Sequence, residues 1–334
     1  MTIHAWAATE KGGALKPFEY EPGALGAEQV EVKVEHCGIC HSDLSMLDNE
    51  WGSTQYPFVP GHEIVGSITA IGPQVKGRTV GQRIGIGWFV GSCMHCGQCL
   101  GGDQHLCGKT ESTIVGRHGG FADTVRAHWA WTFPLPATMD AKSAGPLFCG
   151  GITVFNPILL GNIKPTDRVG VVGIGGLGHM AVKFLRAWGC EVTAFTSSAG
   201  KHAEAKAMGA HHAVASNDKD ALKKVRGSLD FIIVTVNVPL DWQGYLTALA
   251  PKGKLHFVGA ILEPLSIPVF KLMGGQKSVS SSPTGSPTAI AQMLEFAARH
   301  KIAPQVEYFP MAKVNEAMAH LREGKARYRV VLTR

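Results

Sequence analysis

The sequence predicts an α/β fold that combines a doubly wound parallel sheet domain with a second, β-rich domain. The chain has 334 residues, more than one hydrophobic core usually organises. Its first 150 residues hold short strand patterns broken by many glycines and prolines, whereas apolar strands alternate with amphipathic helices after that point. Such alternation indicates a parallel sheet with right-handed crossovers. We therefore expect two domains of different type.

The strands of the first domain are expected to be short. The clearest is QVEVKVEHC at 29–37, where three valines alternate with three charged residues, as in a strand with one buried face. IVGSITAIG at 64–72 and TVGQRIGIG at 79–87 indicate further strands closed by glycine turns. These patterns predict a β-rich domain over residues 1–150.

The parallel domain is expected over residues 151–285. RVGVVG at 168–173 is an apolar strand, and Gly176–Trp188 follows it with apolar residues spaced as on one helix face. Further strands are expected at 191–195, 230–236 and 254–259, with helices at 201–209 and 240–249. Two later helices, at 289–300 and 314–321, are expected to rejoin the first domain, which residues from about 286 to 334 would complete.

A glycine-rich loop joins the first strand of the parallel domain to its helix. GIGGLGH contains Gly173-x-Gly175-x-x-Gly178 between a strand and an amphipathic helix, the context that makes this pattern informative. Small residues let the backbone approach a pyrophosphate, whose charge is favoured by free N–H groups and the helix dipole. The loop predicts a Rossmann dinucleotide-binding domain; the simpler interpretation is a tight glycine turn.

The end of the second parallel strand indicates which dinucleotide binds. An NAD site normally carries an acidic residue about 20 positions after the glycine loop. Here the strand ends in Thr196, Ser197 and Ser198, with Lys201 close behind and no acid. Hydroxyls and an ammonium group favour a 2′-phosphate, so NADP(H) is the expected cofactor. Alternatively, the two serines only cap the next helix.

Four cysteines crowd into the segment 93–107. Cys93, Cys96, Cys99 and Cys107 have the spacing Cys-x2-Cys-x2-Cys-x7-Cys, and glycines between them ease a tight wrapping of the chain. Four thiolates at this spacing can surround one zinc ion and leave it no vacancy. The cluster therefore predicts a structural zinc lobe rather than the reactive centre.

A second, dispersed set offers fewer ligands. Cys40 in GICHSD, His62 in GHEIVG and Cys149 in LFCGG supply two thiolates and one imidazole, with no obvious fourth Cys or His. Two cysteines and one histidine are the composition of an open zinc site of the alcohol dehydrogenase type. Each residue taken singly is more typical of a buried core position.

Composition disfavours several other classes of function. The net charge is +6, but no run of five or six like charges suggests a nucleic-acid or membrane surface. No apolar run approaches the ~18 residues that cross a bilayer. The start, MTIHAWAATEKGG, lacks the basic and apolar regions of a secretion signal. We therefore expect a cytoplasmic protein without nucleic-acid or membrane partners, whose close cysteines bind metal.

Several motifs occur in a characteristic order: GICHSDL, VPGHEIVG, the four-cysteine lobe, CGGITVFNP, GIGGLGH and ARYRVV. With them the sequence resembles the zinc-dependent medium-chain alcohol dehydrogenases, and within these the cinnamyl alcohol dehydrogenase-like, NADP(H)-dependent aldehyde reductases. The likeness runs from about Val30 to the C-terminus. It implies a GroES-like fold for the β-rich catalytic domain and suggests a homodimer paired through the last Rossmann strands, near 277–281.

The resemblance also assigns roles to residues of the catalytic site. Cys40, His62 and Cys149 would hold a catalytic zinc, so that the chain would carry two zinc ions with the structural one. Glu63 would lie beside the metal and be able to approach or ligate it. Asp43 would accept a hydrogen bond from the other N–H of His62. Ser42 would hydrogen-bond the substrate oxygen.

Cofactor contacts follow from the same resemblance. The glycine-loop residues Gly173, Gly175, Gly176, Leu177 and Gly178 would line the pyrophosphate. Thr196, Ser197 and Lys201 would bind the 2′-phosphate. Thr153 and Arg329 would lie near the cofactor.

One position departs from the family pattern. Many relatives carry a histidine three residues after the family's Ser or Thr, and this chain has Ser45 there. The proton then travels from Ser42 through the ribose hydroxyl and water, or the proton relay is slower.

The candidates for a substrate pocket are Trp51, Trp88 and Phe89. The alternative is that these rings only pack in the core or at the surface.

The expected reaction is reversible hydride transfer between NADP(H) and a primary alcohol/aldehyde pair. Reduction of aromatic or medium aliphatic aldehydes is the favoured direction and substrate class. A zinc polyol or secondary-alcohol dehydrogenase using NAD(P) is an alternative, and a non-catalytic zinc and nucleotide-binding sensor is a more distant one. The open zinc site favours an enzyme, because a structural role has no use for a vacancy.

Overall fold

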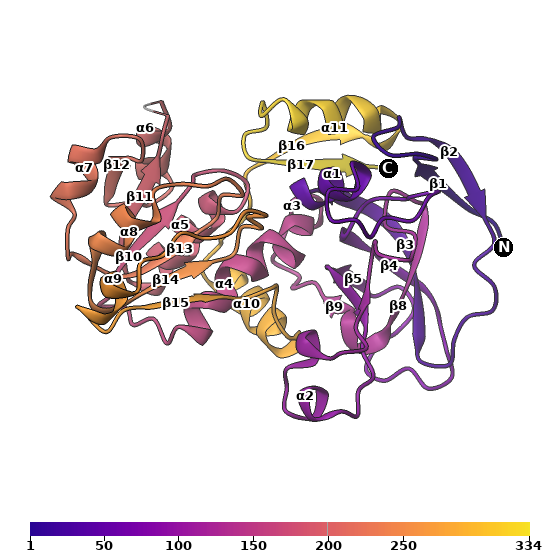
Figure 1. Cartoon of the computed structure of the whole chain (residues 1–334). Helices are drawn as coiled ribbons and strands as arrows, with labels where there is room; N and C mark the ends of the chain where they lie inside the picture. The colour runs from indigo at the N-terminus through magenta and orange to yellow at the C-terminus, as the bar shows by residue number, and fades with distance from the viewer. Residues whose placement is uncertain (199) are drawn as a thin grey trace. The chain divides into compact units, whose positions relative to one another are not determined.

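The computed structural model describes residues 1–198 and 200–334. Unit 1 contains Met1–Ile152 and Gly285–Arg334, and unit 2 contains Thr153–Thr284. The chain therefore leaves unit 1 and later returns to it. Within unit 1, the yellow C-terminal elements consequently lie beside the indigo N-terminal ones, as Figure 1 shows.

Unit 2 is built on a six-stranded sheet in which every adjacent pair is parallel. The first strand, β10, lies inside the sheet, with the next two strands on one side of it and the last three on the other. This is a doubly wound Rossmann sheet, which confirms the predicted fold class. In sheet order the strands are β12 (His212–Ala215), β11 (Glu191–Thr196), β10 (Arg168–Val172), β13 (Leu229–Val234), β14 (Leu249–Phe257) and β15 (Ser278–Ser281).

The helix after the glycine loop follows the predicted apolar pattern. α5 (Gly178–Trp188) buries Met180, Ala181 and Phe184 completely, and Gly189 ends it at φ 111, a conformation that favours glycine. The other helices of this unit are α6 (Gly200–Ala207), α7 (Lys219–Lys224), α8 (Trp242–Ala248) and α9 (Val269–Met273). α4 (Gly150–Leu160) carries the chain out of unit 1.

Unit 1 contains a seven-stranded sheet centred on β3. Its path is β16 (Val306–Pro310), β17 (Arg329–Thr333), β3 (Gln29–Ile39), β4 (Glu63–Ile71), β5 (Arg83–Ile86) and β9 (Phe133–Pro134), with β8 (Thr124–His128) also paired to β3. The strand expected at 79–87 is confined to β5, because Thr79–Gln82 forms a turn closed by the bond from Gln82 N to Thr79 O.

Smaller elements complete unit 1. Two further pairs of strands are β1 (Ile3–Ala7) with β2 (Lys16–Tyr20) and β6 (Phe89–Gly91) with β7 (Glu111–Ser112). The helices are α1 (His41–Leu47), α2 (Gly97–Leu100), α3 (Ala141–Ala144), α10 (Pro287–Arg299) and α11 (Val314–Arg322), with the 3₁₀ turns η1 (Gln104–Leu106), η2 (Trp129–Trp131), η3 (Gly145–Phe148) and η4 (Met311–Lys313).

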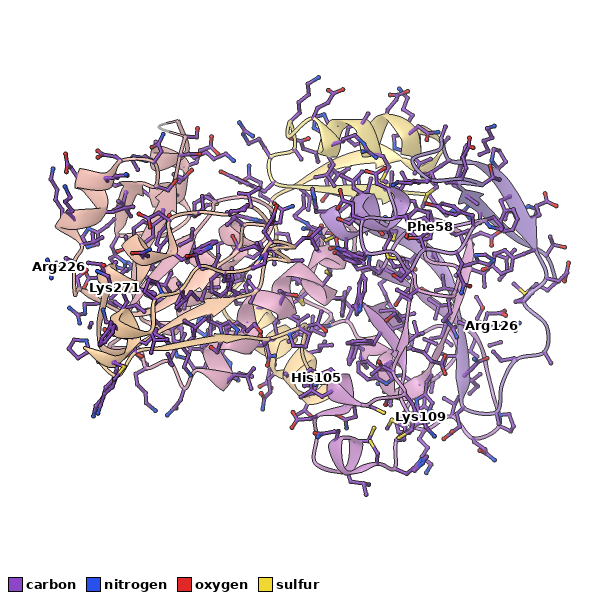
Figure 2. The ribbon with its side chains drawn as sticks, in the orientation of Figure 1. Phe58, His105, Lys109, Arg126, Arg226 and Lys271 are labelled. Atoms are coloured by element: carbon purple, nitrogen blue, oxygen red, sulfur yellow. The ribbon has the colours of Figure 1, made fainter. Side chains whose placement is uncertain are left out.

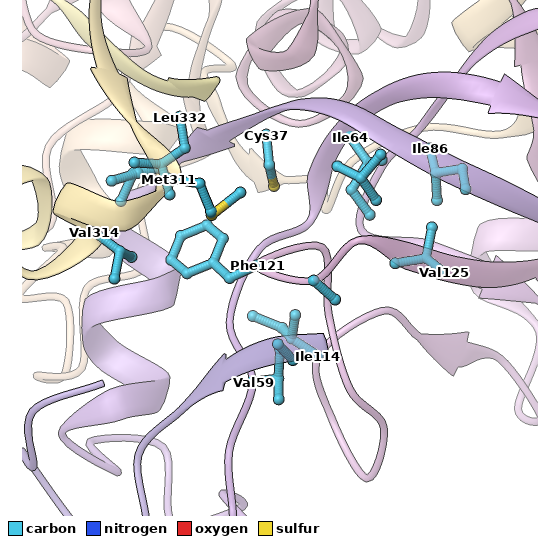
Figure 3. Packing of buried hydrophobic residues seen from close by; sticks show 14 of the residues in the cluster. Cys37, Val59, Ile64, Ile86, Ile114, Phe121, Val125, Met311, Val314 and Leu332 are labelled. Carbon is cyan, nitrogen blue, oxygen red and sulfur yellow. The ribbon is translucent and has the colours of Figure 1, made fainter. Parts of the chain in front are cut away.

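The core of unit 1 joins the two ends of the chain. Phe121 is fully buried and lies near Met311 and Val314 of the returning segment, as Figure 3 shows. α11 contributes Val314, Ala317 and Met318, the apolar face that its sequence predicts. The C-terminal segment is therefore part of this hydrophobic core.

No single helix in the described parts of the chain is long and apolar enough to cross a membrane. One bent pair, Ala141–Phe148 with α4, meets the same criterion by length and composition alone. Its residues from Ser143 to Phe148 are buried.

Candidate metal and cofactor sites

Two cysteines and a histidine meet at strand ends in unit 1. Cys40 lies between β3 and α1, His62 directly precedes β4, and Cys149 follows η3. Cys149 Sγ lies 3.9 Å from Cys40 Sγ and 3.3 Å from His62 Nε2. All three are buried, and with a carboxylate oxygen of Glu63 their ligand atoms lie within 4.8 Å of one another. We name Cys40, His62 and Cys149 the two-thiolate site.

The pairing of β3 with β4 explains part of this arrangement. Gly38 pairs with Glu63 in antiparallel register, so that Cys40 and His62 extend from neighbouring strand ends. A Cβ on Gly38 would lie 2.1 Å from Glu63 Oε2, which shows how closely the carboxylate packs against that strand. A side chain at position 38 would therefore displace Glu63.

Asp43 organises the two-thiolate site through three contacts. Its Oδ2 accepts from Cys40 N at 2.8 Å, while Oδ1 accepts from Gly61 N at 2.8 Å and lies 3.1 Å from His62 Nδ1. Burial alone would lower the pKa of His62, but the Asp43 carboxylate and the Cys40 sulfur hold it well above its usual range. Asp43 thereby directs Nε2 of His62 toward Cys149.

The thiols of this site fit a soft divalent cation. The hydrogen bond from Cys149 holds the pKa of Cys40 well below its usual range, and the same pairing, reinforced by burial, raises the pKa of Cys149. Two thiolates this close repel each other, so a cation between them would favour the ionised form of both. Thiolate sulfur and imidazole nitrogen are ligands that zinc accepts, so this donor set fits the expected metal.

Glu63 pairs with a cation from the far end of the sequence. Its Oε1 accepts from the guanidinium of Arg329 at the start of β17, with side chains 0% and 5% exposed. Burial raises the pKa of Glu63, and the Arg329 charge opposes that rise. Among the described residues Glu63 Oε2 has no hydrogen-bond partner. The pair shows that Arg329, expected near the cofactor, contacts the metal-site carboxylate.

The four-cysteine lobe is compact. Cys107 Sγ lies 3.5 Å from Cys93 Sγ and 3.7 Å from Cys96 Sγ, and Cys93 Sγ lies 3.9 Å from Cys99 Sγ. Backbone N–H groups at 95 and 96 lower the pKa of Cys93 to about 6, as suits a metal-binding thiolate. Figure 2 shows sulfur atoms gathered near Lys109, whose N–H donates to Cys107 Sγ at 3.3 Å. Four sulfurs at this spacing fit zinc and leave no vacancy.

In the glycine loop of unit 2, the backbone at Gly178 lies very close to the backbone at Gly173. Gly173 has φ 90, and a Cβ on Gly178 would lie 1.8 Å from Gly173 O, so α5 can begin close to β10 only without a side chain there. A Cβ on Gly175 would meet nothing within 4 Å, so the loop backbone there is not covered. This uncovered backbone at a helix start fits a dinucleotide pyrophosphate.

The end of β11 carries the residues expected at a 2′-phosphate. Thr196 is buried and its Oγ1 accepts from Ser198 N at 3.3 Å, whereas Ser197 is exposed. Lys201 Nζ donates to Ile174 O in the glycine loop at 3.1 Å. An ammonium group therefore lies next to the loop that would hold the pyrophosphate.

Comparison with known proteins gives two family matches. Residues 26–137 match the alcohol dehydrogenase GroES-like domain, and residues 176–299 match the zinc-binding dehydrogenase domain. Over 331 residues the chain is 57% identical to aldehyde reductase AdhA of Synechocystis, covering 99% of this chain and 98% of that protein. The chain belongs to the zinc-containing medium-chain alcohol dehydrogenases.

Solved structures place it near the cinnamyl alcohol dehydrogenases of this family. The enzyme from Sorghum bicolor superposes with a TM-score of 0.96 at 36% identity, covering 100% of this chain and 98% of that one. The enzyme from Helicobacter pylori, solved with NADP(H), gives 0.92 at 30% identity over 100% and 98% of the chains. Mannitol dehydrogenase from Apium graveolens is 41% identical over 98% of this chain and 92% of its own. This dehydrogenase is thus a cinnamyl alcohol dehydrogenase-like oxidoreductase with two candidate zinc sites.

The aromatic residues expected in the dehydrogenase's substrate pocket pack in two different places. Trp88 packs edge-on against His62, with centroids 5.0 Å apart, and against Trp51 at 5.9 Å. Phe89, the next residue, instead packs against Trp131 at 5.5 Å. Phe89, the first residue of β6, thus packs against a different ring from Trp88, which precedes the strand and contacts His62.

Two contacts of the dehydrogenase escaped the sequence analysis. Arg329 contacts Glu63 across 266 positions, a separation that no local pattern reveals. Ser92 Oγ lies 3.6 Å from Cys99 Sγ and accepts from Trp131 Nε1 at 3.3 Å, which adds a polar contact to the zinc lobe. Serine next to a cysteine cluster gives no distinctive signal in the sequence.

Proposed function

We propose that this dehydrogenase is an NADP(H)-dependent aldehyde reductase with the balance aldehyde + NADPH + H⁺ → primary alcohol + NADP⁺. The single observation that carries the proposal is the two-thiolate site, which offers a metal two sulfurs and one nitrogen beside the Ser42 hydroxyl and the Trp88 ring. A zinc ion there would polarise the substrate carbonyl while the nicotinamide supplies the hydride.

Ser42 is the proposed proton carrier. Its Oγ lies 3.7 Å from Cys40 Sγ, within reach of a substrate oxygen directed at the two-thiolate site. During reduction the Ser42 hydroxyl would donate its proton to the carbonyl oxygen, and during oxidation Oγ would accept the alcohol's proton. Ser45, in the position of the family's histidine, is buried and so is not an outlet to solvent. The proton would then leave Ser42 by the cofactor's ribose hydroxyl and water.

Asp43 and Glu63 have supporting roles in this proposal. Asp43 would hold His62 in the tautomer whose Nε2 is free for the metal. Glu63 would remain beside the site as a carboxylate able to approach the metal.

The proposed substrates are aromatic and medium aliphatic aldehydes. Trp88 and Trp51 form an edge-to-face pair next to His62, and both rings are only partly buried. Aromatic faces and edges bind planar rings and exclude water from them. A polyol would instead require several polar partners, and the two indole rings offer only one N–H each.

NADP(H) is the proposed cofactor, bound mainly by unit 2. Gly173, Gly175 and Gly178 would admit the pyrophosphate, with Gly176 and Leu177 lining it. Thr196, Ser197 and Lys201 would bind the 2′-phosphate, in keeping with the NADP(H) found with the Helicobacter pylori relative. Thr153 and Arg329 would lie near the cofactor.

The proposal divides the chain by task. Residues 1–150 with about 286–334 would form the catalytic domain, and residues 151–285 the dinucleotide-binding domain. The reducing cytoplasm is the proposed compartment, since all eight cysteines are free thiols and two groups of them are placed for metal.

A second copy of the chain is the proposed partner. β15 is an edge strand of the unit 2 sheet, and α9 nearby exposes Val269, Phe270 and Met273 at 64%, 86% and 65%. An open strand edge beside exposed apolar side chains is the kind of surface that a homodimer covers. Light scattering of Phe270→Asp against the native chain tests this: the variant should be monomeric, and an unchanged mass would contradict the proposal.

An aldehyde panel tests the main proposal. Purified enzyme should oxidise NADPH with aromatic and medium aliphatic aldehydes, and much more slowly with ketones; mannitol should give little NADP⁺ reduction. Faster turnover of mannitol than of any primary alcohol would favour a polyol dehydrogenase, the activity named for one relative. Absence of turnover on all substrates by zinc-loaded enzyme would refute the proposal.

A further inference from the structure

The segment 49–54, which carries Trp51, is closed into a short loop by its own hydrogen bonds. Thr54 N donates to Asn49 Oδ1 at 3.1 Å, and Gly52 N donates to Asn49 O at 3.2 Å. Gly52 has φ 69 and Asn49 has φ 49, so the backbone turns tightly at both positions. Trp51 is therefore held on a small closed loop and not on a helix or strand.

A single carbonyl oxygen of α1 receives both ends of this loop. Asn49 N donates to Met46 O at 3.0 Å, and Thr54 Oγ1 donates to the same oxygen at 2.6 Å. Met46 is fully buried and lies in the last turn of α1, where carbonyl groups lack partners within the helix. The Thr54 hydroxyl is thus the side-chain bond that ties the end of the loop to the helix.

The same helix carries the proposed proton donor. Ser42 and Asp43 lie in the first turn of α1, one helix length from Met46. At the other side of the loop, Trp51 packs against Trp88 with centroids 5.9 Å apart and an interplanar angle of 69°. The bond from Thr54 therefore sets the place of Trp51 relative to the helix that holds Ser42. We name Trp51 and Trp88 the aromatic wall.

We propose that Thr54 is a positioning residue whose hydroxyl, bonded to Met46 O, holds Trp51 against Trp88 and so sets the preference for aromatic aldehydes. The inference rests on the proposed function, because that function assigns the aromatic wall to the substrate. Without the hydroxyl the bond from Thr54 N to Asn49 Oδ1 remains. The loop would then stay closed but lose its side-chain tie to α1.

Steady-state kinetics with an aromatic and a short aliphatic aldehyde test this role. Thr54→Val retains the shape of the side chain and removes the hydroxyl. We expect KM for the aromatic aldehyde to rise about fivefold, as for loss of one hydrogen bond, and kcat to change by less than about twofold. KM for the aliphatic aldehyde should also change by less than about twofold. Thr54→Ser, which retains the hydroxyl, should restore the native KM.

A double-mutant cycle shows whether Thr54 acts through Trp51. Trp51→Ala removes the ring, so adding Thr54→Val should not change the ratio of the two KM values any further. Near-UV circular dichroism gives a readout without turnover, because it senses how the two indoles of the aromatic wall are arranged. We expect the spectrum to change in Thr54→Val, and the same substitution to cause no change in the Trp51→Ala protein.

Thr247→Val is the matched control. Thr247 is partly buried, as Thr54 is, and its Oγ1 donates to a backbone carbonyl, Gln243 O, at 2.8 Å. It lies in α8 of unit 2, whereas the aromatic wall belongs to unit 1. This variant should retain the native ratio of the two KM values, which excludes a general effect of losing a threonine hydroxyl.

The results separate this inference from the proposed function. Absence of aldehyde turnover in the native protein would refute the proposed function and the inference that rests on it. An active native protein with an unchanged KM ratio in Thr54→Val would overturn the inference alone, as would an equal rise of both KM values or an added loss in the double variant. If Thr54→Val does not fold, Thr54→Ala takes its place. Failure of both to fold would overturn the inference, because the hydroxyl would then serve the fold and not the aromatic wall.

Discussion

Trp88 packs edge-on against His62, with ring centroids 5.0 Å apart and an interplanar angle of 83°. The indole therefore forms a wall of the proposed metal site and, through Trp51, extends an aromatic surface away from it. This contact would connect the proposed substrate pocket with a proposed ligand of the metal.

Replacing Trp88 should change substrate preference. In Trp88→Leu we expect kcat/KM for aromatic aldehydes to fall about tenfold, because aromatic packing is lost, and that for short aliphatic aldehydes to change by about twofold. Steady-state kinetics with both classes measure the ratio. Phe89→Leu, which alters a ring packed against Trp131 rather than His62, is the control and should leave the ratio unchanged. Equal losses for both classes in Trp88→Leu would contradict a role in specificity.

The two metal sites should separate by mutation. Elemental analysis is expected to find two zinc ions per chain, one for each cluster. Cys40→Ser should bind one zinc ion fewer and show no turnover, with little change in Tm. Cys96→Ser should lose the other zinc and lower Tm, because a structural zinc contributes folding free energy. Cys190→Ser, in unit 2 and outside both clusters, should retain both ions. Unfolding of Cys40→Ser would show that the two-thiolate site is not separable from the fold.

Asp43 should matter for metal affinity more than for folding of the sheet. Asp43→Asn retains the size of the side chain but loses the charge that accepts from Cys40 N, Gly61 N and His62. We expect zinc affinity at the two-thiolate site to fall by about 10- to 100-fold, measured by competition with a chelator. The four-cysteine lobe should retain its ion and serves as the internal control. Native-like retention of both ions would argue against this role of Asp43.

Lys201 should determine cofactor preference. We expect Lys201→Ala to lower kcat/KM for NADPH about 30-fold, as for loss of a charged hydrogen bond, while kcat/KM for NADH changes about twofold. Lys206→Ala, an exposed lysine of α6, is the control for general loss of charge. A similar effect on both cofactors, or none, would remove Lys201 from the 2′-phosphate site.

His256 should make stability depend on pH. Its ring nitrogens lie 2.8 Å from Ser280 Oγ and 2.9 Å from Ser282 Oγ, and burial, with a smaller effect of Lys254, lowers its pKa from 6.5 to about 4. Between these values the unfolded chain binds the proton and the folded chain does not, so the stabilisation is full above pH 6.5 and is lost as pH falls toward 4.

The size of this effect is on the order of 3 kcal/mol. Denaturant unfolding between pH 4 and 7 should show a shallower pH dependence in His256→Gln than in the native protein. His4→Gln, which removes an exposed histidine, should retain the native slope. Parallel curves for native protein and His256→Gln would contradict the assignment.

Local patterns explain which features could be predicted from sequence. The four cysteines lie within fifteen positions and the glycine loop within six, so each cluster is positioned by its own short segment. The helix face of α5 and the order of strands and helices are likewise set by nearby residues, because periodicity depends only on neighbours along the chain. The grouping of Cys40 with His62 and Cys149 depended on their ligand chemistry and on resemblance to a family, because no local spacing joins them.

By itself, then, the sequence determined the two domain types, the glycine loop and the four-cysteine lobe. Tertiary structure decided the rest of the site. It turned Trp88 toward His62 and Phe89 toward Trp131, and it set Arg329 against Glu63 from 266 positions away. The physical reason is that strand pairing brings distant segments together, and the register of β3 with β4 and β17 determines which side chains share a buried space.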